Sequence, residues 1–124
     1  SYLIPKGHPY FSENTMENYR TVNTLVMKTL QPLLPEGNFS FIPERRCSST
    51  FCMAHPTPYD LLCDGKKIAG SAQRKTKLGF LHQGTLSIVA PPQSLLQKLL
   101  PRNISEAILE NSFFFTEDLS ELPK

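Results

Sequence analysis

The sequence lacks several features that would place it in a specialised class of protein. It contains no run of about 18 apolar residues, so we expect no transmembrane helix. It contains no internal repeats and no low-complexity segment. The formal net charge is only +2, so no global field favours nucleic acid or an anionic membrane as a partner. Any electrostatic argument about function must therefore be local.

Cysteine is scarce, with residues only at Cys47, Cys52 and Cys63. An odd and sparse set cannot pair completely within one chain, and it is more typical of a reducing compartment than of a secreted disulfide scaffold. We therefore expect a cytoplasmic protein. The cysteines and the three histidines never fall into a paired spacing such as Cys-x-x-Cys, so no metal site is predicted. The glycine-flanked serine of a nucleophile elbow is also absent.

What is present is typical of one compact domain. Of the 124 residues, 40% are hydrophobic and 19% are charged, and a chain of this length can bury a single core. The sequence opens with Ser1 and a strand-like stretch rather than with an initiator methionine. We therefore expect it to be a piece of a longer protein.

The clearest local pattern is that of a helix over residues 12–33. Apolar residues recur there at steps of three and four, which places them on one helical face. Asn14 followed by Glu17 predicts a capping box at the start, and two prolines and a glycine between residues 32 and 37 predict the end. The residues of the apolar face are Tyr19, Val22, Val26, Leu30 and Leu33.

Five runs have the composition or the alternation of β-strands. Asp64-Gly65 is a strong two-residue hairpin sequence between two of them, and the charged stretch Gln73–Leu78 predicts the next turn. Residues 44–58 have no period and predict a loop, which is a frequent place for functional residues. The predicted strands are Tyr2–Ile4, Asn38–Pro43, Tyr59–Cys63, Lys67–Ala72 and Phe80–Ala90, the last interrupted at Gly84.

Two short helices are predicted after the strands. Two prolines introduce the helix Ser94–Leu100, and Asn103 with Glu106 has the pattern of a second capping box. The tail from Phe113 fits no single pattern. Helices before and after a group of neighbouring strands predict an α+β, or mixed α/β, fold in which helices pack on a β-sheet.

One predicted hairpin carries the residues best suited to chemistry. Its second strand places Lys67 next to the small residues of the run 69–72. Small side chains let another group approach the backbone closely, so a lysine there could hold a carbonyl or phosphate oxygen of a flat ligand. The alternative is an ordinary hairpin with solvated lysines, because charged residues are usually exposed.

The same stretch resembles a family signature. The run Gly65–Gln73, GKKIAGSAQ, followed by His82–Thr85, HQGT, is similar to the signature of lipoate–protein ligase A and its octanoyltransferase relatives, which join a fatty-acyl or lipoyl group to a protein lysine. The match extends upstream through Pro56 and residues 59–61, and nearly the whole chain aligns. The resemblance implies a catalytic domain like that of class II aminoacyl-tRNA synthetases and biotin ligases, of which residues 1–124 would form part.

The resemblance also implies the residues of the site. Lys67 matches the family's essential lysine, which contacts the acyl carbonyl, and strand alternation predicts that Lys66 faces the other way. A fixed ammonium group there would stabilise negative charge as it develops on the carbonyl oxygen. For His82, a structural imidazole is an open alternative. The residues that match the family's substrate pocket are Gly70, Ser71, Ala72, His82, Gly84 and Thr85.

Cys52 bears on the type of reaction. It precedes Lys67 in a segment that resembles the cysteine segment of the octanoyltransferase branch, where the cysteine carries the acyl group as a thioester. A nearby ammonium favours the thiolate, which is the nucleophile. On this hypothesis an octanoyl group passes from an acyl carrier protein to Cys52 and then to a lysine, and no ATP is needed. The alternatives are a structural cysteine and, with less support, a base at His55.

Two other functions stay open on the resemblance. The first is a ligase that activates free lipoate or octanoate with ATP and Mg²⁺. Ligases of the family commonly carry Arg-Asn-Asp where this chain has Thr57–Asp60, TPYD, so the sequence favours transfer. The second is a non-catalytic paralogue that binds lipoate.

The implied acceptor is a lipoyl domain of a 2-oxoacid dehydrogenase or of the glycine cleavage H protein. A local basic cluster could dock this typically acidic domain, and no aromatic residue interleaves with it, so we expect no nucleic acid. The family places an arginine- and glycine-rich loop upstream of the region seen here, so we expect an incomplete pocket and no activity from these residues alone. The cluster consists of Lys66, Lys67, Arg74, Lys75 and Lys77.

Overall fold

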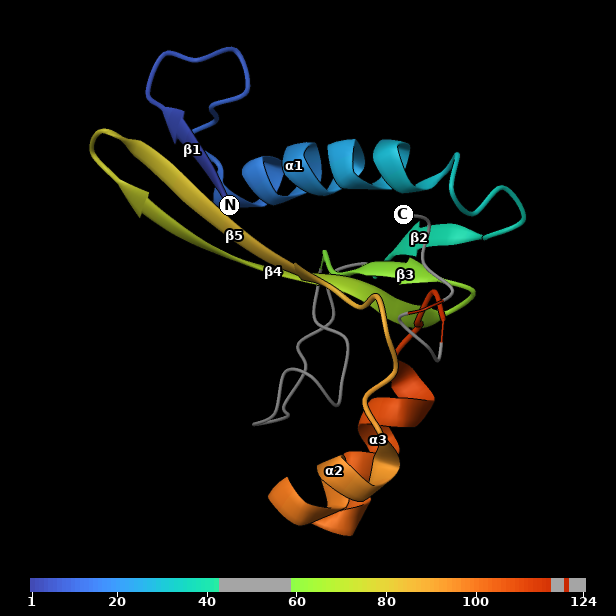
Figure 1. Ribbon diagram of the computed structural model, residues 1–124. Helices are drawn as coiled ribbons and strands as arrows, with labels where there is room; N and C mark the ends of the chain where they lie inside the picture. The colour runs from blue at the N-terminus through green and yellow to red at the C-terminus, as the bar shows by residue number, and fades with distance from the viewer. Residues whose placement is uncertain (43–58, 117–119, 121–124) are drawn as a thin grey trace.

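The structure is a computed structural model and describes residues 1–42, 59–116 and 120. Within these residues a β-sheet packs with helices, which confirms the predicted α+β class (Figure 1). None of the described helices is long and apolar enough to cross a membrane. In chain order the elements are β1 (Tyr2–Pro5), α1 (Thr15–Leu30), β2 (Phe39–Phe41), β3 (Leu61–Cys63), β4 (Lys66–Thr76), β5 (Gly79–Leu86), α2 (Gln93–Leu99) and α3 (Arg102–Asn111).

The sheet has the strand order β1-β5-β4-β3-β2, and every neighbouring pair is antiparallel. The long hairpin of β4 and β5 runs through its centre. Helix α1 lies along one face, whereas α2 and α3 extend from the other side (Figure 1). The two faces of the hairpin therefore have different surroundings.

The hydrophobic core lies between α1 and strands β3 and β4. Leu30, at the end of α1, belongs to one buried cluster with Leu61, Cys63 and Ile68. Burial of apolar surface, at about 25 cal/mol per Å², is the main favourable term that holds the helix on the sheet. Leu33 was predicted to extend the apolar face, but it lies beyond the end of α1 and is exposed.

Asn14 caps the start of α1 as predicted, but Glu17 does not make the direct contact of a capping box. Asn14 is the N-cap residue, and its side-chain oxygen accepts a hydrogen bond from the N–H of Met16 at 2.9 Å. The carboxylate of Glu17 accepts from the hydroxyl of Ser12, and the oxygen of that hydroxyl accepts from the N–H of Asn14 at 3.0 Å. A hydroxyl thus relays the contact that a capping box makes directly.

The predicted turn over Gln73–Leu78 is wrong, because β4 continues to Thr76. The last residues of β4 pair with β5, from Gln73 opposite His82 to Thr76 opposite Gly79, so only two residues connect the strands. The charges that indicated a turn instead lie along a long hairpin (Figure 1). Strand β5 is shorter than predicted and ends at Leu86.

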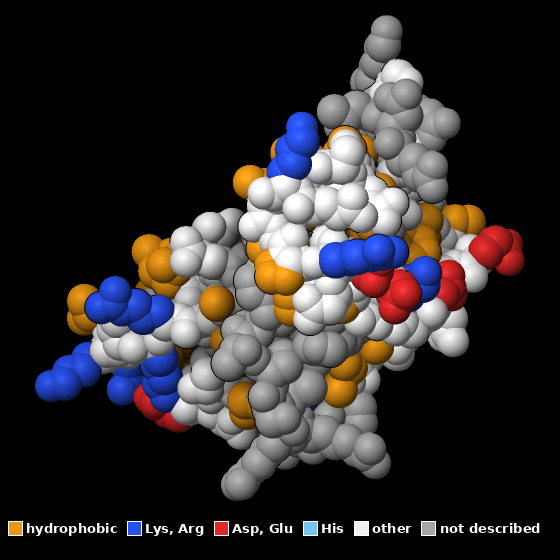
Figure 2. All heavy atoms as spheres, turned by 90° about the horizontal axis from the view of Figure 1, so that it is seen from below, with side chains coloured by type: hydrophobic (Ala, Val, Ile, Leu, Met, Phe, Trp, Pro, Cys, Tyr) orange, Lys and Arg blue, Asp and Glu red, His pale blue; other side chains and the backbone are white. Residues whose placement is uncertain are grey.

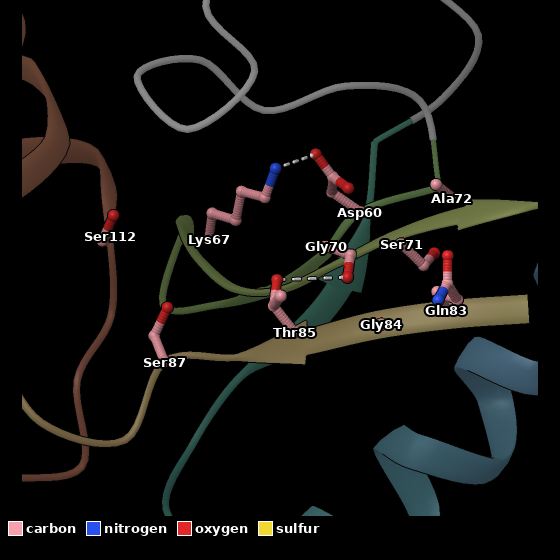
Figure 3. A pocket seen from close by; sticks show the side chains of 10 residues that line it. All are labelled: Asp60, Lys67, Gly70, Ser71, Ala72, Gln83, Gly84, Thr85, Ser87 and Ser112. Atoms are coloured by element: carbon pink, nitrogen blue, oxygen red, sulfur yellow. Dashed lines mark hydrogen bonds and ion pairs between the residues drawn. The ribbon is translucent and has the colours of Figure 1, made fainter. Parts of the chain in front are cut away.

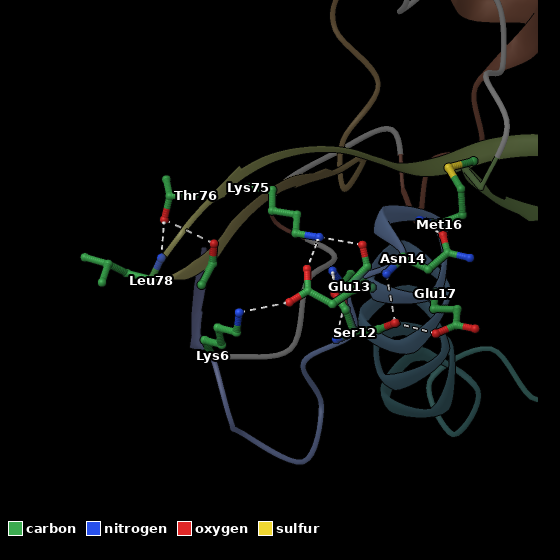
Figure 4. A network of polar contacts seen from close by, with 11 residues as sticks. Lys6, Ser12, Glu13, Asn14, Met16, Glu17, Lys75, Thr76 and Leu78 are labelled. Atoms are coloured by element: carbon green, nitrogen blue, oxygen red, sulfur yellow. Dashed lines mark hydrogen bonds and ion pairs between the residues drawn. The ribbon is translucent and has the colours of Figure 1, made fainter.

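The charged end of the hairpin is tied to the segment before α1. The carboxylate of Glu13 pairs with Lys75 at 2.7 Å and with Lys6 at 3.2 Å (Figure 4). Hydrogen bonds from these two ammonium groups lower the pKa of the Glu13 carboxyl. Because the glutamate side chain is 67% exposed, the pairs contribute little stability.

The second predicted capping box is wrong. Helix α3 begins at Arg102, with Pro101 at the N-cap position, and no described side chain caps it. Proline suits a helix start because its fixed φ is compatible with the first turn. Asn103 is therefore already inside the helix, and Glu106 pairs with Arg102 at 2.7 Å instead.

Gly79 lies where β1 and β5 approach most closely. A Cβ added there would lie 2.2 Å from the carbonyl oxygen of Ile4 and 2.8 Å from the Cα of Pro5, both of which are backbone atoms of β1. We expect Gly79→Ala to lower the free energy of unfolding by about 1–3 kcal/mol, because β1 must shift away from β5. Urea denaturation measures this loss.

Gly65→Asn is the control for this substitution. Gly65 has a φ of 76°, which asparagine tolerates, and nothing lies within 4 Å of an added Cβ. We expect a smaller loss of free energy of unfolding than in Gly79→Ala, because asparagine bears only the cost of the left-handed conformation and meets no neighbouring atom. Wild-type stability in Gly79→Ala would contradict the close approach of the two strands.

Candidate active site

A cleft of about 370 Å³ lies over the centre of the β4–β5 hairpin, on the face turned away from α1 (Figure 3). Small residues of both strands form its floor, so backbone atoms make up much of the surface. Its lining consists of Lys67 and Gly70–Ala72 from β4, Gln83–Thr85 from β5, and Asp60, Ser87 and Ser112 from flanking segments.

A β-bulge aims Lys67 into this cleft. The register between β3 and β4 shifts, because Leu62 pairs with Lys67 whereas Leu61 pairs with Ala69. Ile68, between Lys67 and Ala69 on β4, is therefore the extra residue, and its side chain packs in the core. Side chains alternate along a regular strand, so without the bulge Lys67 and Gly70 would lie on opposite faces. The bulge puts both on the cleft face.

The ammonium group of Lys67 is held close to the backbone of β4. Its Nζ lies 2.8 Å from Oδ2 of Asp60, in an ion pair (Figure 3). A Cβ on Gly70 would lie 2.7 Å from Cε of Lys67 and 2.9 Å from its Nζ, so the lysine fills the space that the glycine leaves. The lysine side chain is 14% exposed and the aspartate side chain 3%, so the anion is the more deeply buried partner.

Five residues predicted from the family's pocket share this cleft with Lys67. They come from the centres of the two long strands, which pair directly across the hairpin. Their contacts with a substrate stay predictions. Lys66 does not belong to the described lining, in line with the predicted alternation. The five residues are Gly70, Ser71, Ala72, Gly84 and Thr85.

His82 lies on the opposite face of the sheet, so the structure does not bring it to Lys67. Its ring lies edge-on to the ring of Tyr19, with 5.8 Å between centroids, and its Nδ1 is 2.7 Å from the side-chain nitrogen of Gln73. The residue is 2% exposed, and burial lowers the pKa of its imidazole. It borders a second cavity of about 260 Å³, and Gly70, Ser71, Gly84 and Thr85 line this cavity as well as the cleft. These contacts fit the structural alternative, and a substrate contact stays a prediction.

Cys47, Cys52 and His55 lie outside the described residues. The expected approach of Cys52 to Lys67 is therefore still a prediction. Cys63 is fully buried in the core, and burial raises the pKa of its thiol. A buried neutral thiol is a poor nucleophile. Within the described ranges, no three His, Cys, Asp or Glu side chains come together as metal ligands.

Four polar residues that line the cleft were not predicted as site residues. Asp60 and Gln83 were identified in the sequence only as part of the family match, and Ser87 and Ser112 lie outside the motifs. Ser112 reaches the cleft because the segment after α3 runs beside β4. It forms a parallel bridge with Lys67, and the N–H of Phe113 donates to the lysine's carbonyl oxygen at 2.8 Å. Only the tertiary fold brings such distant residues together.

The cleft is suited to a group on which negative charge develops. A cation is fixed over bare backbone and is backed by a buried carboxylate, so it needs little rearrangement when an oxygen acquires charge. Tetrahedral intermediates of acyl transfer carry such an oxygen. The geometry is therefore compatible with the class of site that binds acyl or phosphoryl oxygens.

Comparison with known proteins identifies the family of the chain. A sequence profile of the biotin/lipoate A/B protein ligase family matches residues 1–89. The chain belongs to this family, as its motifs predicted. No solved structure matches the chain.

Several curated relatives are named octanoyltransferase LipM. The protein from Staphylococcus aureus (strain NCTC 8325 / PS 47) is 30% identical over 93 residues, which cover 69% of this chain and 34% of the relative. The protein from Lysinibacillus sphaericus (strain C3-41) is 30% identical over 104 residues, with coverages of 77% and 37%. The protein from Bacillus subtilis (strain 168) is 27% identical over 94 residues, with coverages of 69% and 34%. The chain thus spans about a third of the length of these relatives.

The lowered pKa of His82 predicts a pH-dependent stability. The unfolded state, with a histidine pKa of about 6.5, binds the proton more readily than the folded state. This contribution to stability is complete above about pH 6.5 and is lost as the pH falls toward the folded-state pKa. We expect the free energy of unfolding, measured with urea, to decrease between about pH 7.5 and about pH 5.5.

His82→Gln keeps a polar side chain that does not titrate. We expect the free energy of unfolding of this variant to decrease less than that of the wild type over the same pH range. His8→Gln is the control, because His8 is exposed. Its pH dependence should match that of the wild type. A wild-type slope in His82→Gln would rule out the buried imidazole as the source.

Proposed function

We propose that the chain is part of a catalytic domain that attaches an octanoyl or lipoyl group to a specific lysine of lipoyl domains. The observation that carries the proposal is the Lys67–Asp60 ion pair above Gly70, within the stretch that matches the family. A cation fixed in this way can bind the acyl carbonyl oxygen and stabilise its negative charge during transfer.

The proposed reaction has two steps, both at an acyl carbonyl. In the first, the thiolate of Cys52 attacks the carbonyl carbon of an octanoyl thioester on an acyl carrier protein. The C–S bond to the carrier then breaks, and the carrier leaves as a thiolate that takes up the proton given up by the Cys52 thiol. In the second, the acceptor lysine's amine attacks the Cys52 thioester, an amide forms and the cysteine thiol is restored. Lys67 faces the oxyanion in both steps.

Two observations favour transfer over ATP-dependent ligation. The curated relatives described above are named octanoyltransferases. The chain also has Thr57–Asp60, TPYD, where ligases commonly have Arg-Asn-Asp. A thioester donor already supplies the energy for amide formation, so transfer needs neither ATP nor Mg²⁺. A ligase would need both, with free lipoate or octanoate as its substrate.

The proposed acceptor is the lipoyl domain of a 2-oxoacid dehydrogenase or the glycine cleavage H protein. Lys and Arg side chains gather at the end of the β4–β5 hairpin, on the left in Figure 2. Arg74 and Lys77 are exposed there, next to the paired Lys75. A basic surface of this kind complements an acidic partner and would give salt-sensitive binding. We further propose that residues outside positions 1–124 complete the acyl pocket.

The nucleophile can be tested with intact-protein mass spectrometry. The full-length protein is incubated with octanoyl acyl carrier protein and no ATP. We expect an octanoyl adduct on Cys52 that Cys52→Ala lacks, because only a thiolate in the site forms the thioester. Cys47→Ala is the control and should keep the adduct. Octanoylation of a lipoyl domain that needs ATP and forms no adduct would instead assign ligation.

Gly70→Ala tests the space that the lysine occupies. Its methyl would overlap Cε and Nζ of Lys67, so the end of the lysine side chain must shift from its position beside Asp60. We expect octanoyl transfer to fall at least about tenfold, towards the loss of about 10²–10³-fold expected for Lys67→Ala. Gly84→Ala, whose Cβ would meet its nearest neighbour at 3.5 Å, should lose less. Equal losses in the two variants would contradict this role of Gly70.

A further inference from the structure

The chain enters β3 through a backbone conformation that is unusual for a residue with a side chain. Tyr59 has a φ of 68°, in the left-handed region, which costs free energy for any residue except glycine. Helix α1 holds this conformation from one side. The side-chain nitrogen of Asn23 donates to the carbonyl oxygen of Tyr59 at 2.6 Å, and the ring of Tyr19 stacks on the Tyr59 ring with 6.4 Å between centroids.

This turn sets the direction of the next residue. Asp60 follows Tyr59 immediately, and its side chain is only 3% exposed, so the carboxylate has little freedom to move. It lies on the cleft side of the sheet, beside Gly70, where an added Cβ would be 3.4 Å from Oδ1. A buried carboxylate requires partners of opposite charge or hydrogen bonds, and Lys67 supplies one at 2.8 Å.

From this geometry we propose that Asp60 is a positioning residue for the acyl transfer proposed above, on which this inference rests. It acts through Lys67 and does not touch the acyl group. The carboxylate holds the ammonium over the Gly70 backbone, and α1 in turn holds the carboxylate through Asn23 and Tyr59. A free lysine side chain has many rotamers, whereas a fixed one already faces the carbonyl oxygen when the substrate arrives.

The first test is the kinetics of Asp60→Asn in the full-length protein, with octanoyl acyl carrier protein as donor and a lipoyl domain as acceptor. Asparagine keeps the size of the side chain but removes its charge. We expect kcat to fall at least about tenfold, and by less than in Lys67→Ala, because the cation remains but is no longer fixed. The KM for the lipoyl domain should stay within about twofold, because the acceptor does not contact Asp60.

Asp64→Asn is the matched control. Asp64 lies on the next turn of the chain, is exposed, and has a φ of 51° that asparagine also tolerates. It lies outside the cleft lining. The same loss of charge should therefore leave kcat unchanged.

The second test separates positioning from a general structural role. In a Lys67→Met background, Asp60→Asn should cause no further loss of kcat, because there is no ammonium left to position. The same change should raise the melting temperature of Lys67→Met, because it removes a buried charge that has lost a partner. In this background stability would thus rise while kcat stays unchanged, which a general loss of folding cannot produce.

The outcomes distinguish this inference from the proposed function. Absence of octanoyl transfer in the wild type, with or without ATP, would overturn both. Normal transfer in the wild type and in Asp60→Asn would overturn the positioning role alone. An additional loss of kcat from Asp60→Asn in the Lys67→Met background would also overturn it, because Asp60 would then act independently of the lysine.

Discussion

An extra residue in strand β4 sets the geometry on which the site depends. The bulge turns Ile68 and Ala69 together towards the core, so that Lys67 and Gly70 share the opposite face. A regular strand would direct the lysine towards the apolar cluster under α1, where an ammonium group is costly to bury. The bulge therefore satisfies two demands at once, because the core receives apolar side chains and the cleft receives a cation. Bulges are common beside functional sites for this reason.

The two faces of the β4–β5 hairpin consequently have separate tasks. On the α1 face, side chains of the hairpin make structural contacts: Ser71 with Asn23, and Gln73 with His82. On the other face, a smooth floor of small residues lies below the Lys67–Asp60 pair. One short sequence motif thus encodes both a support and a site. Gly70, Ser71, Gly84 and Thr85 border cavities on both faces, whereas Lys67 lines the cleft and His82 lines the cavity on the α1 face.

Much of this arrangement could be predicted from sequence because its signals are local. The apolar period of α1, the cap at Asn14 and the Asp64-Gly65 turn depend on neighbouring residues, and the structure has each of them. The family motif identified Lys67 and the small residues of the cleft floor, although their roles still await experiment. The length of β4 was missed because charge was interpreted as a turn, whereas cross-strand pairing with β5 decided it.

Other features could not be predicted because they depend on distant contacts. Strict alternation cannot reveal a bulge, since the shift arises from how β3 pairs with β4. The face occupied by His82 follows from its pairing with Gln73 and from the position of Tyr19. The contribution of Ser112 requires the chain to return from α3 to β4. The segment that holds Cys52 lies outside the described residues, so its relation to the lysine stays a prediction.

The hydrogen bond from Phe113 to the carbonyl of Lys67 has a mechanical consequence. Helix α2 buries none of its residues in the described structure, and α2 and α3 project away from the sheet (Figure 1). The two helices thus form an arm whose base is joined to the main chain of the lysine. A load applied to the arm would reach the main chain of Lys67 through this hydrogen bond, and it would reach β5 through the residues that join β5 to α2.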